Sequence, residues 1–484
     1  MKKSIYVAIS AFLIVAVVVA IGAIVLFFGK SPNDTPDDQT QKHSLVGEQI
    51  TIYDAQGNVL ISTNTFTDIY GVECWQYLEF VLSDMAEIIA LKEDCSLEEA
   101  QDKVFDRGYQ IYTAFDSTVF DALKTIGARW GKHCNTAAAI TDLQGRLLAV
   151  RCTDTEGRQA NYALERRSPY SSFKTLSVYA QAVEKGIANW STLYKDSPYK
   201  QMKDEDGTLR DWPANSTNRY SQENMTVYDA LRTSTNTVAV KCLADVGIKN
   251  SIEFLQTKFG IPLKEETYVV KKYGAEEVLG NIALGYLETG VTTVEMAGYY
   301  QIFATGGKYA EPNTIDKVSV EDNPSWYTRK EFTRQVISPG TADIMNKLLQ
   351  GVVAPGGTGE MTFCEDVEIA GKTGTGDNNA DNWFVGVTPG YSLAVWHGQN
   401  TNNQAEEMFA TVIKKLYSSL PNANRKFITH ENLQQIAYCA HSGKAFSENC
   451  AMIDSGYYAS DATLPVCDTC KKTIKGEFSN EKRL

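Results

Sequence analysis

The chain is organised around one stretch, Ile369-Ala370-Gly371-Lys372-Thr373-Gly374-Thr375-Gly376, followed after a polar loop by Trp383-Phe384-Val385-Gly386-Val387. The two apolar runs predict a pair of strands joined by a hairpin loop. The glycines let another backbone or a ligand lie close to the first strand. Thr373 and Thr375 project from one face at the strand period of two, and this face is suited to hold a substrate carboxylate. Taken alone, the tripeptide Lys-Thr-Gly fits an ordinary glycine-rich edge strand equally well.

Length, composition and charge bound the class of protein. A chain of 484 residues predicts two or three domains. Its hydrophobic content of 43% is ordinary for a globular protein and allows a large core. The formal net charge of −13 argues against nucleic acid as a partner, because phosphate binding needs a clustered basic surface.

Residues 5–29 form an uncharged run that is long enough to span a bilayer as a helix. Lys2 and Lys3 precede it, which favours a cytoplasmic N-terminus and an exported body. A cleaved signal peptide is the alternative, but its apolar core is normally shorter. We therefore expect a cytoplasmic stub and membrane anchor at 1–30. Residues 31–49 are rich in Asp, Gln and Pro and predict a flexible linker.

Two folded regions are predicted beyond the linker. In residues 50–134, a hairpin at 51–60, a helix at 77–91 and a capping box that begins at Ser96 indicate a small membrane-proximal module. In residues 135–418, a hairpin at 137–151 is followed by mostly helical patterns from about 171 to 304. Strand patterns return at 368–375, 382–387 and 391–397. Strands at both ends with helices between them predict a mixed α/β domain with a helical insert.

The C-terminal tail, residues 419–484, contains four of the ten cysteines: Cys439, Cys450, Cys467 and Cys470. Such a cluster is suited to zinc, to two disulfides or to plain thiols. Ten residues separate Cys439 from Cys450, a poor match to a zinc ribbon. The spacing favours disulfides or thiols, and we expect a structural tail without a metal site.

The spacing Ser-x-x-Lys has chemical meaning, because on a helix it puts both side chains on one face within hydrogen-bonding reach. A neutral lysine there can take the serine's proton. The spacing occurs at Ser171 and Lys174, at Ser197 and Lys200, and at Ser479 and Lys482. Only the first pair begins an apolar helical pattern, which Gly186 is suited to end. We therefore expect Ser171 and Lys174 to form the reactive pair.

The spacing Ser-x-Asn has several occurrences, at Ser62/Asn64, Ser216/Asn218, Ser234/Asn236 and Ser447/Asn449. Ser234 falls between two apolar helical stretches, 227–231 and 238–243. A polar junction of this kind is either a helix cap or a site delivered by a loop between helices. On its own, it is more consistent with a cap.

The order of the three motifs carries the functional argument. Ser171-x-x-Lys174, then Ser234-x-Asn236, then Lys372-Thr373-Gly374 on a strand is the set of β-lactamases and penicillin-binding proteins. The flanks extend the match at Pro169-Tyr170-Ser171-Ser172-Phe173-Lys174, at 229–241, at Gly356-Gly357-Thr358-Gly359 and at 381–386. From about residue 107 onward, the chain resembles the transpeptidase domain of class A penicillin-binding proteins. The resemblance implies an α+β fold of the serine β-lactamase/D,D-peptidase type, with a mainly antiparallel sheet flanked by helices and a helical subdomain.

The same resemblance implies a D,D-transpeptidase that cross-links peptidoglycan stem peptides and is acylated by β-lactams. Ser171 would be the nucleophile and Lys174 the general base, with Ser234 and Lys372 in the proton relay. Asn236 would hold the substrate amide, and Thr373, Gly374 and Thr375 would bind the terminal carboxylate. No cofactor is implied.

The sequence departs from the family in two ways. Tyr170 stands where glycine is usual and Thr175 where proline is common, which puts substrate range and β-lactam affinity in doubt. The segment between 60 and 77 is also too short for the glycosyltransferase domain of class A proteins. We therefore expect no glycan polymerase activity, an extracellular catalytic domain on a bacterial cell membrane, and a separate polymerase as a further partner.

Other functions use the same motifs. A D,D-carboxypeptidase differs only in using water as acceptor, and a serine β-lactamase hydrolyses its acyl-enzyme rapidly. A β-lactam-binding sensor or scaffold would keep Ser171 but show little turnover. A Ser-His-Asp hydrolase is disfavoured, because of the five histidines only His397 lies near the expected sheet.

Overall fold

The computed structural model describes residues 50–62, 69, 71–157, 159–203, 206–263, 275–398 and 404–470. These residues lie within one compact unit, Glu48–Leu484. The expected anchor at 5–29 and the linker at 31–49 lie outside the described residues. Within the described part of the chain, none of the helices is both long and apolar enough to cross a membrane.

The stretch around Lys372 forms an edge strand of a five-stranded antiparallel sheet. The strands follow in the order β14 (Ala370–Thr375), β15 (Asp381–Val387), β16 (Tyr391–Gly398), β4 (Thr136–Asp142) and β5 (Leu147–Thr153). Thr373 pairs with Phe384, and Trp383 pairs with Trp396. This confirms the expected hairpins and the antiparallel sheet assembled from distant segments.

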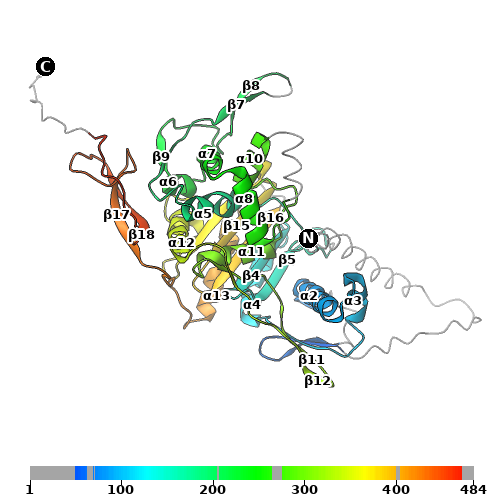
Figure 1. Ribbon diagram of the computed structural model, residues 1–484. Helices are drawn as coiled ribbons and strands as arrows, with labels where there is room; N and C mark the ends of the chain where they lie inside the picture. Colours follow the sequence, from blue (N-terminus) through cyan, green and yellow to red (C-terminus); the bar gives the residue numbers. More distant parts are fainter. Residues whose placement is uncertain are drawn as a thin grey trace, which may run out of the picture. The chain divides into compact units, whose positions relative to one another are not determined.

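Helices cover both faces of this sheet (Figure 1). Because neighbouring residues of a strand point to opposite faces, Tyr391 and Ser392 identify the two layers. Tyr391 packs against Tyr417 of α13 (Ala405–Ser419), with ring centroids 6.2 Å apart. The Ser392 hydroxyl donates to the Ala297 carbonyl of α11 (Thr293–Tyr300) at 2.6 Å. Helix α4 (Ser117–Trp130) packs beside α13 and against β5.

The segment between β5 and α11 is mainly helical. Its helices are η2 (Tyr170–Phe173), η3 (Thr175–Tyr179), α5 (Ala180–Glu184), α6 (Val227–Arg232), α7 (Asn236–Val246), α8 (Ile248–Phe254), η4 (Leu255–Phe259) and α10 (Ala275–Leu284). It also contains four short strands that the sequence did not predict: β6 (Leu193–Lys195), β7 (Lys200–Lys203), β8 (Leu209–Trp212) and β9 (Asn224–Thr226). Their residues are mostly exposed or half-buried, so they carry little of the apolar alternation that reveals a strand.

A second sheet follows the order β12-β11-β3-β1-β2. Its strands are β1 (Thr51–Tyr53), β2 (Val59–Ser62), β3 (Gln110–Thr113), β11 (Ile315–Val320) and β12 (Asn323–Thr328). Helices α2 (Trp75–Glu93) and α3 (Leu97–Lys103) accompany it, and Ser96 forms the expected capping box with Glu99. Because β11 comes from the middle of the chain, the N-terminal module shares its sheet with the larger region. The domain boundaries given above remain predictions.

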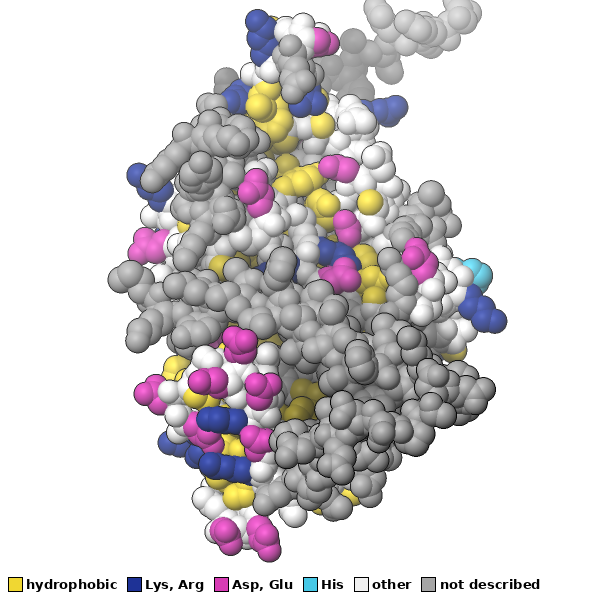
Figure 2. Space-filling model, turned by 90° about the vertical axis from the view of Figure 1, so that its right-hand side faces the viewer, with side chains coloured by type: hydrophobic (Ala, Val, Ile, Leu, Met, Phe, Trp, Pro, Cys, Tyr) yellow, Lys and Arg dark blue, Asp and Glu magenta, His cyan; other side chains and the backbone are white. Residues whose placement is uncertain are grey.

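The remaining elements lie around the large sheet and in the tail. They are η5 (Gln301–Phe303), β10 (Lys308–Tyr309), β13 (Arg334–Gln335), α12 (Pro339–Val353), η6 (Glu360–Thr362), η7 (Asp377–Asn379), β17 (Leu433–Cys439) and β18 (Ile453–Ala459). On the face drawn in Figure 2, the lysine and arginine side chains are interspersed with aspartate and glutamate.

Candidate active site

The turn that carries Ser171 is built by its own sequence. Tyr170 has the left-handed φ of +49°, which explains why glycine suits this position. A left-handed non-glycine residue costs about 1–2 kcal/mol. The Tyr170 amide donates to the Gly285 carbonyl at 3.0 Å, and the Ser172 hydroxyl donates to the Pro169 carbonyl at 2.6 Å. These bonds hold the start of the helix in a fixed shape.

Lys174 lies one turn after Ser171 and is fully buried. Its Nζ donates to the Ser234 carbonyl at 2.8 Å and to Asn236 Oδ1 at 2.6 Å, and it lies 3.4 Å from Ser234 Oγ. Burial, with the nearby Lys372 as second cause, lowers the pKa of Lys174 well below its ordinary value of 10.5. A neutral amine among hydroxyl and amide groups can accept a proton from a serine.

Ser234 sits at the junction between α6 and α7, with φ at +60°. Thr235, which precedes α7, makes no side-chain capping hydrogen bond, and the Ser234 hydroxyl faces both lysines instead. The polar junction is therefore a loop between helices rather than a helix cap. Lys372 Nζ lies 2.9 Å from Ser234 Oγ.

Lys372 is fully buried on β14, and its Nζ also lies 3.1 Å from Thr373 Oγ1. Burial lowers the pKa of Lys372 to about 7, although the carboxylate of Glu406 opposes the shift. Thr373 Oγ1 lies 3.1 Å from Thr358 Oγ1, so the Gly-Gly-Thr-Gly segment borders the same place. This end of the site is suited to an anion, because a lysine and hydroxyl donors converge there.

Gly374 lets β14 lie directly against the turn that carries Ser171. A Cβ atom at this position would lie 2.4 Å from the Pro169 carbonyl oxygen. The close approach expected from the glycine pattern is therefore present, and the neighbouring backbone is the turn that carries Ser171. Thr375 follows with an exposed side chain at the end of the strand.

The structure brings most of the expected residues together. Direct hydrogen bonds connect Lys174, Ser234, Asn236, Lys372 and Thr373. Ser171 is half-buried on the adjacent turn.

Asn236 is held by residues that sequence reasoning missed. Its Nδ2 donates to the Ala214 carbonyl at 2.7 Å, and its amide N–H donates to Asn215 Oδ1 at 3.0 Å. Asn215 in turn donates to the buried carboxylate of Asp196 at 2.8 Å. Burial disfavours the charge of Asp196, but hydrogen bonds from Ser221, Thr237 and Asn215 outweigh it and lower its pKa. Nothing in the spacing of these residues indicates the network.

The other candidate motif residues have different partners. Ser197 Oγ accepts a hydrogen bond from Lys241 Nζ at 2.9 Å. His397 Nε2 accepts from the Gln404 amide at 3.0 Å, and burial lowers the pKa of His397 to about 4. These contacts indicate a structural role for His397 on β16.

The fold and the geometry of the site agree with one family of proteins. Residues 137–417, more than half of the chain, match the family model described as the penicillin binding protein transpeptidase domain. The chain belongs to this family, which confirms the resemblance found in its motifs.

Two relatives illustrate the extent of the similarity. The chain is 30% identical over 270 residues to penicillin-binding protein 1A of Clostridium botulinum (strain Hall), covering 55% of this chain and 31% of that protein. It is 30% identical over 333 residues to penicillin-binding protein 1F of Bacillus subtilis (strain 168), covering 64% and 43%. The chain thus spans less than half the length of these relatives.

Solved structures share the fold. Penicillin-binding protein 1A of Haemophilus influenzae has a TM-score of 0.62 at 17% identity, covering 79% of this chain and 76% of that chain. Penicillin-binding protein 3 of Mycobacterium tuberculosis, complexed with aztreonam, has a TM-score of 0.59 at 16% identity, covering 79% and 99%.

Proposed function

We propose that this protein is a D,D-transpeptidase that cross-links peptidoglycan stem peptides through an acyl-enzyme on Ser171. The observation that carries the proposal is the chain of hydrogen bonds from Lys174 through Ser234 to Lys372, beside the turn of Ser171. It combines a nucleophile, a neutral base and a cation in a buried setting, as nucleophilic catalysis by serine requires.

The first half-reaction forms the acyl-enzyme. Ser171 Oγ attacks the carbonyl carbon of the penultimate D-alanine, and its proton passes to Lys174 Nζ. The backbone N–H groups of Ser171 and Thr375 stabilise the oxyanion of the tetrahedral intermediate. The peptide C–N bond then breaks, and the relay of Lys174, Ser234 and Lys372 returns the proton to the departing amine of the last D-alanine.

The substrate would lie along β14. In this proposal Lys372, Thr373 and Thr375 bind the terminal carboxylate. The contact of Lys372 Nζ with Thr373 Oγ1 and the close approach of Gly374 to the Ser171 turn support it. Asn236 would hold the substrate amide. To do so, its side chain would give up one of its hydrogen bonds with Lys174 or Ala214. In a β-lactam, a carboxylate and a strained amide stand in for the terminal carboxylate and the scissile amide of the stem peptide. A β-lactam would therefore acylate Ser171.

The second half-reaction decides between functions. An amine from a neighbouring stem peptide would attack the acyl-enzyme, form the cross-link and release Ser171. Water as acceptor would make the protein a D,D-carboxypeptidase. The geometry of Lys174 and Ser234 suits either acceptor, because an amine and a water molecule must each lose a proton when they attack the acyl-enzyme.

The expected anchor, the extracellular location and the lack of glycan polymerase activity belong to the same proposal. They rest on residues 5–29, on Lys2 and Lys3, and on the short connection between 60 and 77. We expect the purified chain to form no glycan from lipid II, and a separate polymerase would then supply the strands. Polymer formed by the chain itself would overturn this part.

A donor peptide ending in D-Ala-D-Ala tests the proposal when it is supplied with and without an amine acceptor. We expect D-alanine release and an amide-linked product in the parent and in Ser197→Ala, and neither in Ser171→Ala. Release of D-alanine without the linked product would assign a carboxypeptidase. Acylation by β-lactams without peptide turnover would assign a sensor or scaffold.

A further inference from the structure

The tail contains a small two-stranded unit of which one side packs on the rest of the protein: Tyr438 and Tyr458 are buried, and the rings of Tyr457 and Trp190 have centroids 5.4 Å apart. We call residues 433–470 the tail module; it consists of the hairpin β17–β18 and the loops around it. Met452, Ile453 and Val466 are each more than half exposed. A small unit with exposed apolar side chains and little core of its own is commonly fixed by a cross-link or a metal ion.

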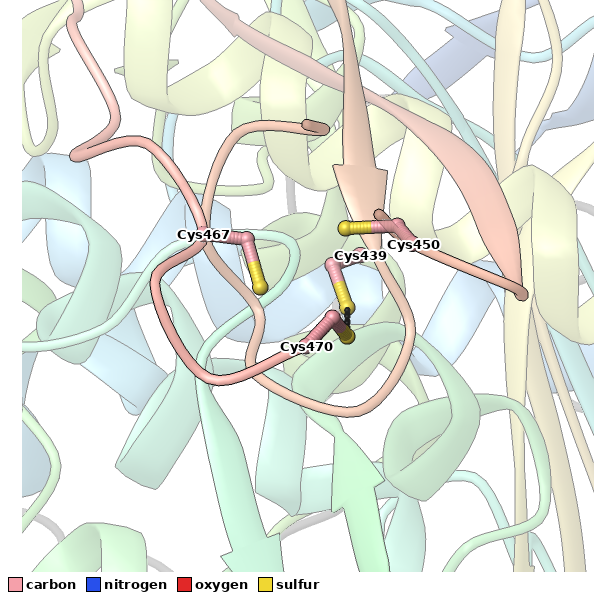
Figure 3. A group of neighbouring side chains, drawn as sticks. All are labelled: Cys439, Cys450, Cys467 and Cys470. Atoms are coloured by element: carbon pink, nitrogen blue, oxygen red, sulfur yellow. Dashed lines mark hydrogen bonds between the residues drawn. The ribbon is translucent and has the colours of Figure 1, made fainter. Parts of the chain in front are cut away.

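Four cysteines converge at one end of this module, namely Cys439, Cys450, Cys467 and Cys470 (Figure 3). Cys439 ends β17, Cys450 lies in the loop between the strands, and Cys467 and Cys470 follow β18. Their spacing in the sequence is uneven, and only the last two have the Cys-x-x-Cys pattern. The fold brings the four cysteines together although their spacing in the sequence is irregular.

The sulfur atoms form one group rather than two separate pairs. All four Sγ atoms lie within 4.8 Å of one another, and those of Cys439 and Cys470 are 3.6 Å apart. A zinc ion binds thiolates at about 2.3 Å in a tetrahedron, which places the sulfurs about 3.8 Å apart. The group therefore has the size of a single four-thiolate site. None of the ten cysteines forms a disulfide in the structure.

Backbone hydrogen bonds hold the loops that present the cysteines. The amides of Ser442 and Gly443 both donate to the Cys439 carbonyl, which closes the first turn. The Cys467 amide donates to the Ala445 carbonyl at 2.8 Å, which ties the second loop to the first. The four side chains are thus gathered by main-chain contacts that do not depend on a bond between the sulfurs.

Polar groups next to the cluster are placed to donate to sulfur. The Ser442 hydroxyl donates to Cys467 Sγ at 3.2 Å, and the Ser447 amide donates to Cys450 Sγ at 3.4 Å. Hydrogen bonds of this kind stabilise thiolates, and they form the outer shell that orients metal ligands. They also spread the charge of a site in which four thiolates outweigh one divalent cation.

The first turn lies directly against the rest of the protein. The Ser191 hydroxyl donates to the Gly443 carbonyl at 2.7 Å, and Gly443 has φ of +67°. A Cβ atom at Gly443 would lie 2.2 Å from the Ser191 carbonyl oxygen. Ordering this turn therefore also fixes the contact between the tail module and the segment that leads into β6.

We propose that Cys439, Cys450, Cys467 and Cys470 bind one zinc ion as a structural four-thiolate site. Each thiol that binds releases its proton, and the ion replaces these protons as the group that holds the loops together. All four coordination positions are filled by protein, so the site has no open position for catalysis. This differs from the disulfides or plain thiols that the spacing favours, because three-dimensional convergence does not require regular spacing.

Metal content and thiol protection of the full chain test the proposal without depending on activity. The chain is purified without chelator or reductant, and its metals are measured by mass spectrometry. We expect about one zinc per chain. Under native conditions, alkylation should spare the four cluster cysteines, and adding a zinc chelator without reductant should make all four reactive. Cobalt added after chelation should give the absorption bands of a tetrahedral thiolate site.

Variants locate the site. Cys450→Ser and Cys470→Ser should lower zinc content at least tenfold, whereas Cys364→Ser, outside the module, should retain it. Cluster cysteines that become reactive only after reduction would show two disulfides and overturn the proposal. Iron in place of zinc, or full zinc content in both cluster variants, would also overturn it.

Discussion

Two buried lysines share the hydroxyl of Ser234, which lies 2.9 Å from Lys372 Nζ and 3.4 Å from Lys174 Nζ. Two ammonium groups this close in a buried site would repel each other, and burial disfavours both charges. Burial lowers the pKa of Lys174 well below its ordinary value, and it lowers the pKa of Lys372 to about 7. In the proposed mechanism, Lys174 is the neutral base and Lys372 still partly holds its proton near neutral pH.

Asn236→Asp should shift the pH dependence of acylation. On the proposed mechanism, the acylation rate of Ser171 should rise with pH as Lys174 loses its proton and fall above about 7 as Lys372 loses its own. A carboxylate in place of Asn236 Oδ1, 2.6 Å from Lys174 Nζ, favours the protonated lysine. It should raise the pKa of Lys174 and move the rising limb about 1–3 pH units higher. The measurement is the second-order acylation rate by a penicillin across pH.

Asn218→Asp is the matched control, since it adds the same charge at an exposed position in a similar Ser-x-Asn motif. Its pH profile should follow that of the parent. An unchanged rising limb in Asn236→Asp would contradict the role of Lys174 as the base.

At the scale of residues, the sequence predicts the reacting groups but not their supports. Ser171, Lys174, Ser234 and Lys372 are recognisable because their motifs follow one another in the family's order, the first at the start of a helical pattern and the last on a strand. Asp196 and Asn215 are not, because a buried carboxylate in a loop has no periodic signature, and its partners come from the β8–β9 loop and from α7. The left-handed φ of Tyr170 also could not be foreseen from a tyrosine.

At the scale of elements, the contact between β14 and η2 decides whether the strand and the turn that carries Ser171 share a site. Gly374→Ala should separate them, because its Cβ would lie 2.4 Å from the carbonyl oxygen of Pro169. A displacement of about 1 Å can cost about 100-fold in rate. We expect a loss of this order in the acylation rate, with a measurable fall in melting temperature.

Gly390→Ala provides the comparison in the turn between β15 and β16 of the same sheet, because the nearest atom to its new Cβ is the Tyr417 hydroxyl at 3.8 Å. It should acylate at the parental rate. If Gly374→Ala reacted within twofold of Gly390→Ala, the close approach would have no catalytic importance.

The strands of the large sheet are predictable from the sequence because their apolar alternation is strong, whereas β6 to β9 are not. Those four strands are short and largely polar, and their pairing depends on contacts that a local pattern does not contain. The helix expected from Ser171 also begins differently, as the 3-10 helix η2 followed by the π-helix η3. Hydrogen bonds from Gln181 to Leu176 and Ser177 carbonyls accompany this irregular start.

At the scale of the whole molecule, distant segments combine in ways that spacing does not reveal. Strand β11 pairs with β3 across about 200 positions of sequence, so the N-terminal module and the larger region are joined in one sheet. The cysteines of the tail module converge although their spacing is uneven. The order of the three motifs along the chain is enough to indicate the family. The shared sheet and the cysteine cluster become visible only in the three-dimensional structure.

The most direct test of the account is the site at which a fluorescent penicillin attaches to the purified full chain, determined by peptide mass spectrometry. We predict one label per chain, on Ser171. Ser171→Ala should lower labelling by at least about 10³-fold, while Ser197→Ala, in the alternative Ser-x-x-Lys motif, should label like the parent. Labelling that survives Ser171→Ala, or a label on another residue of the parent, would contradict the assignment of the nucleophile.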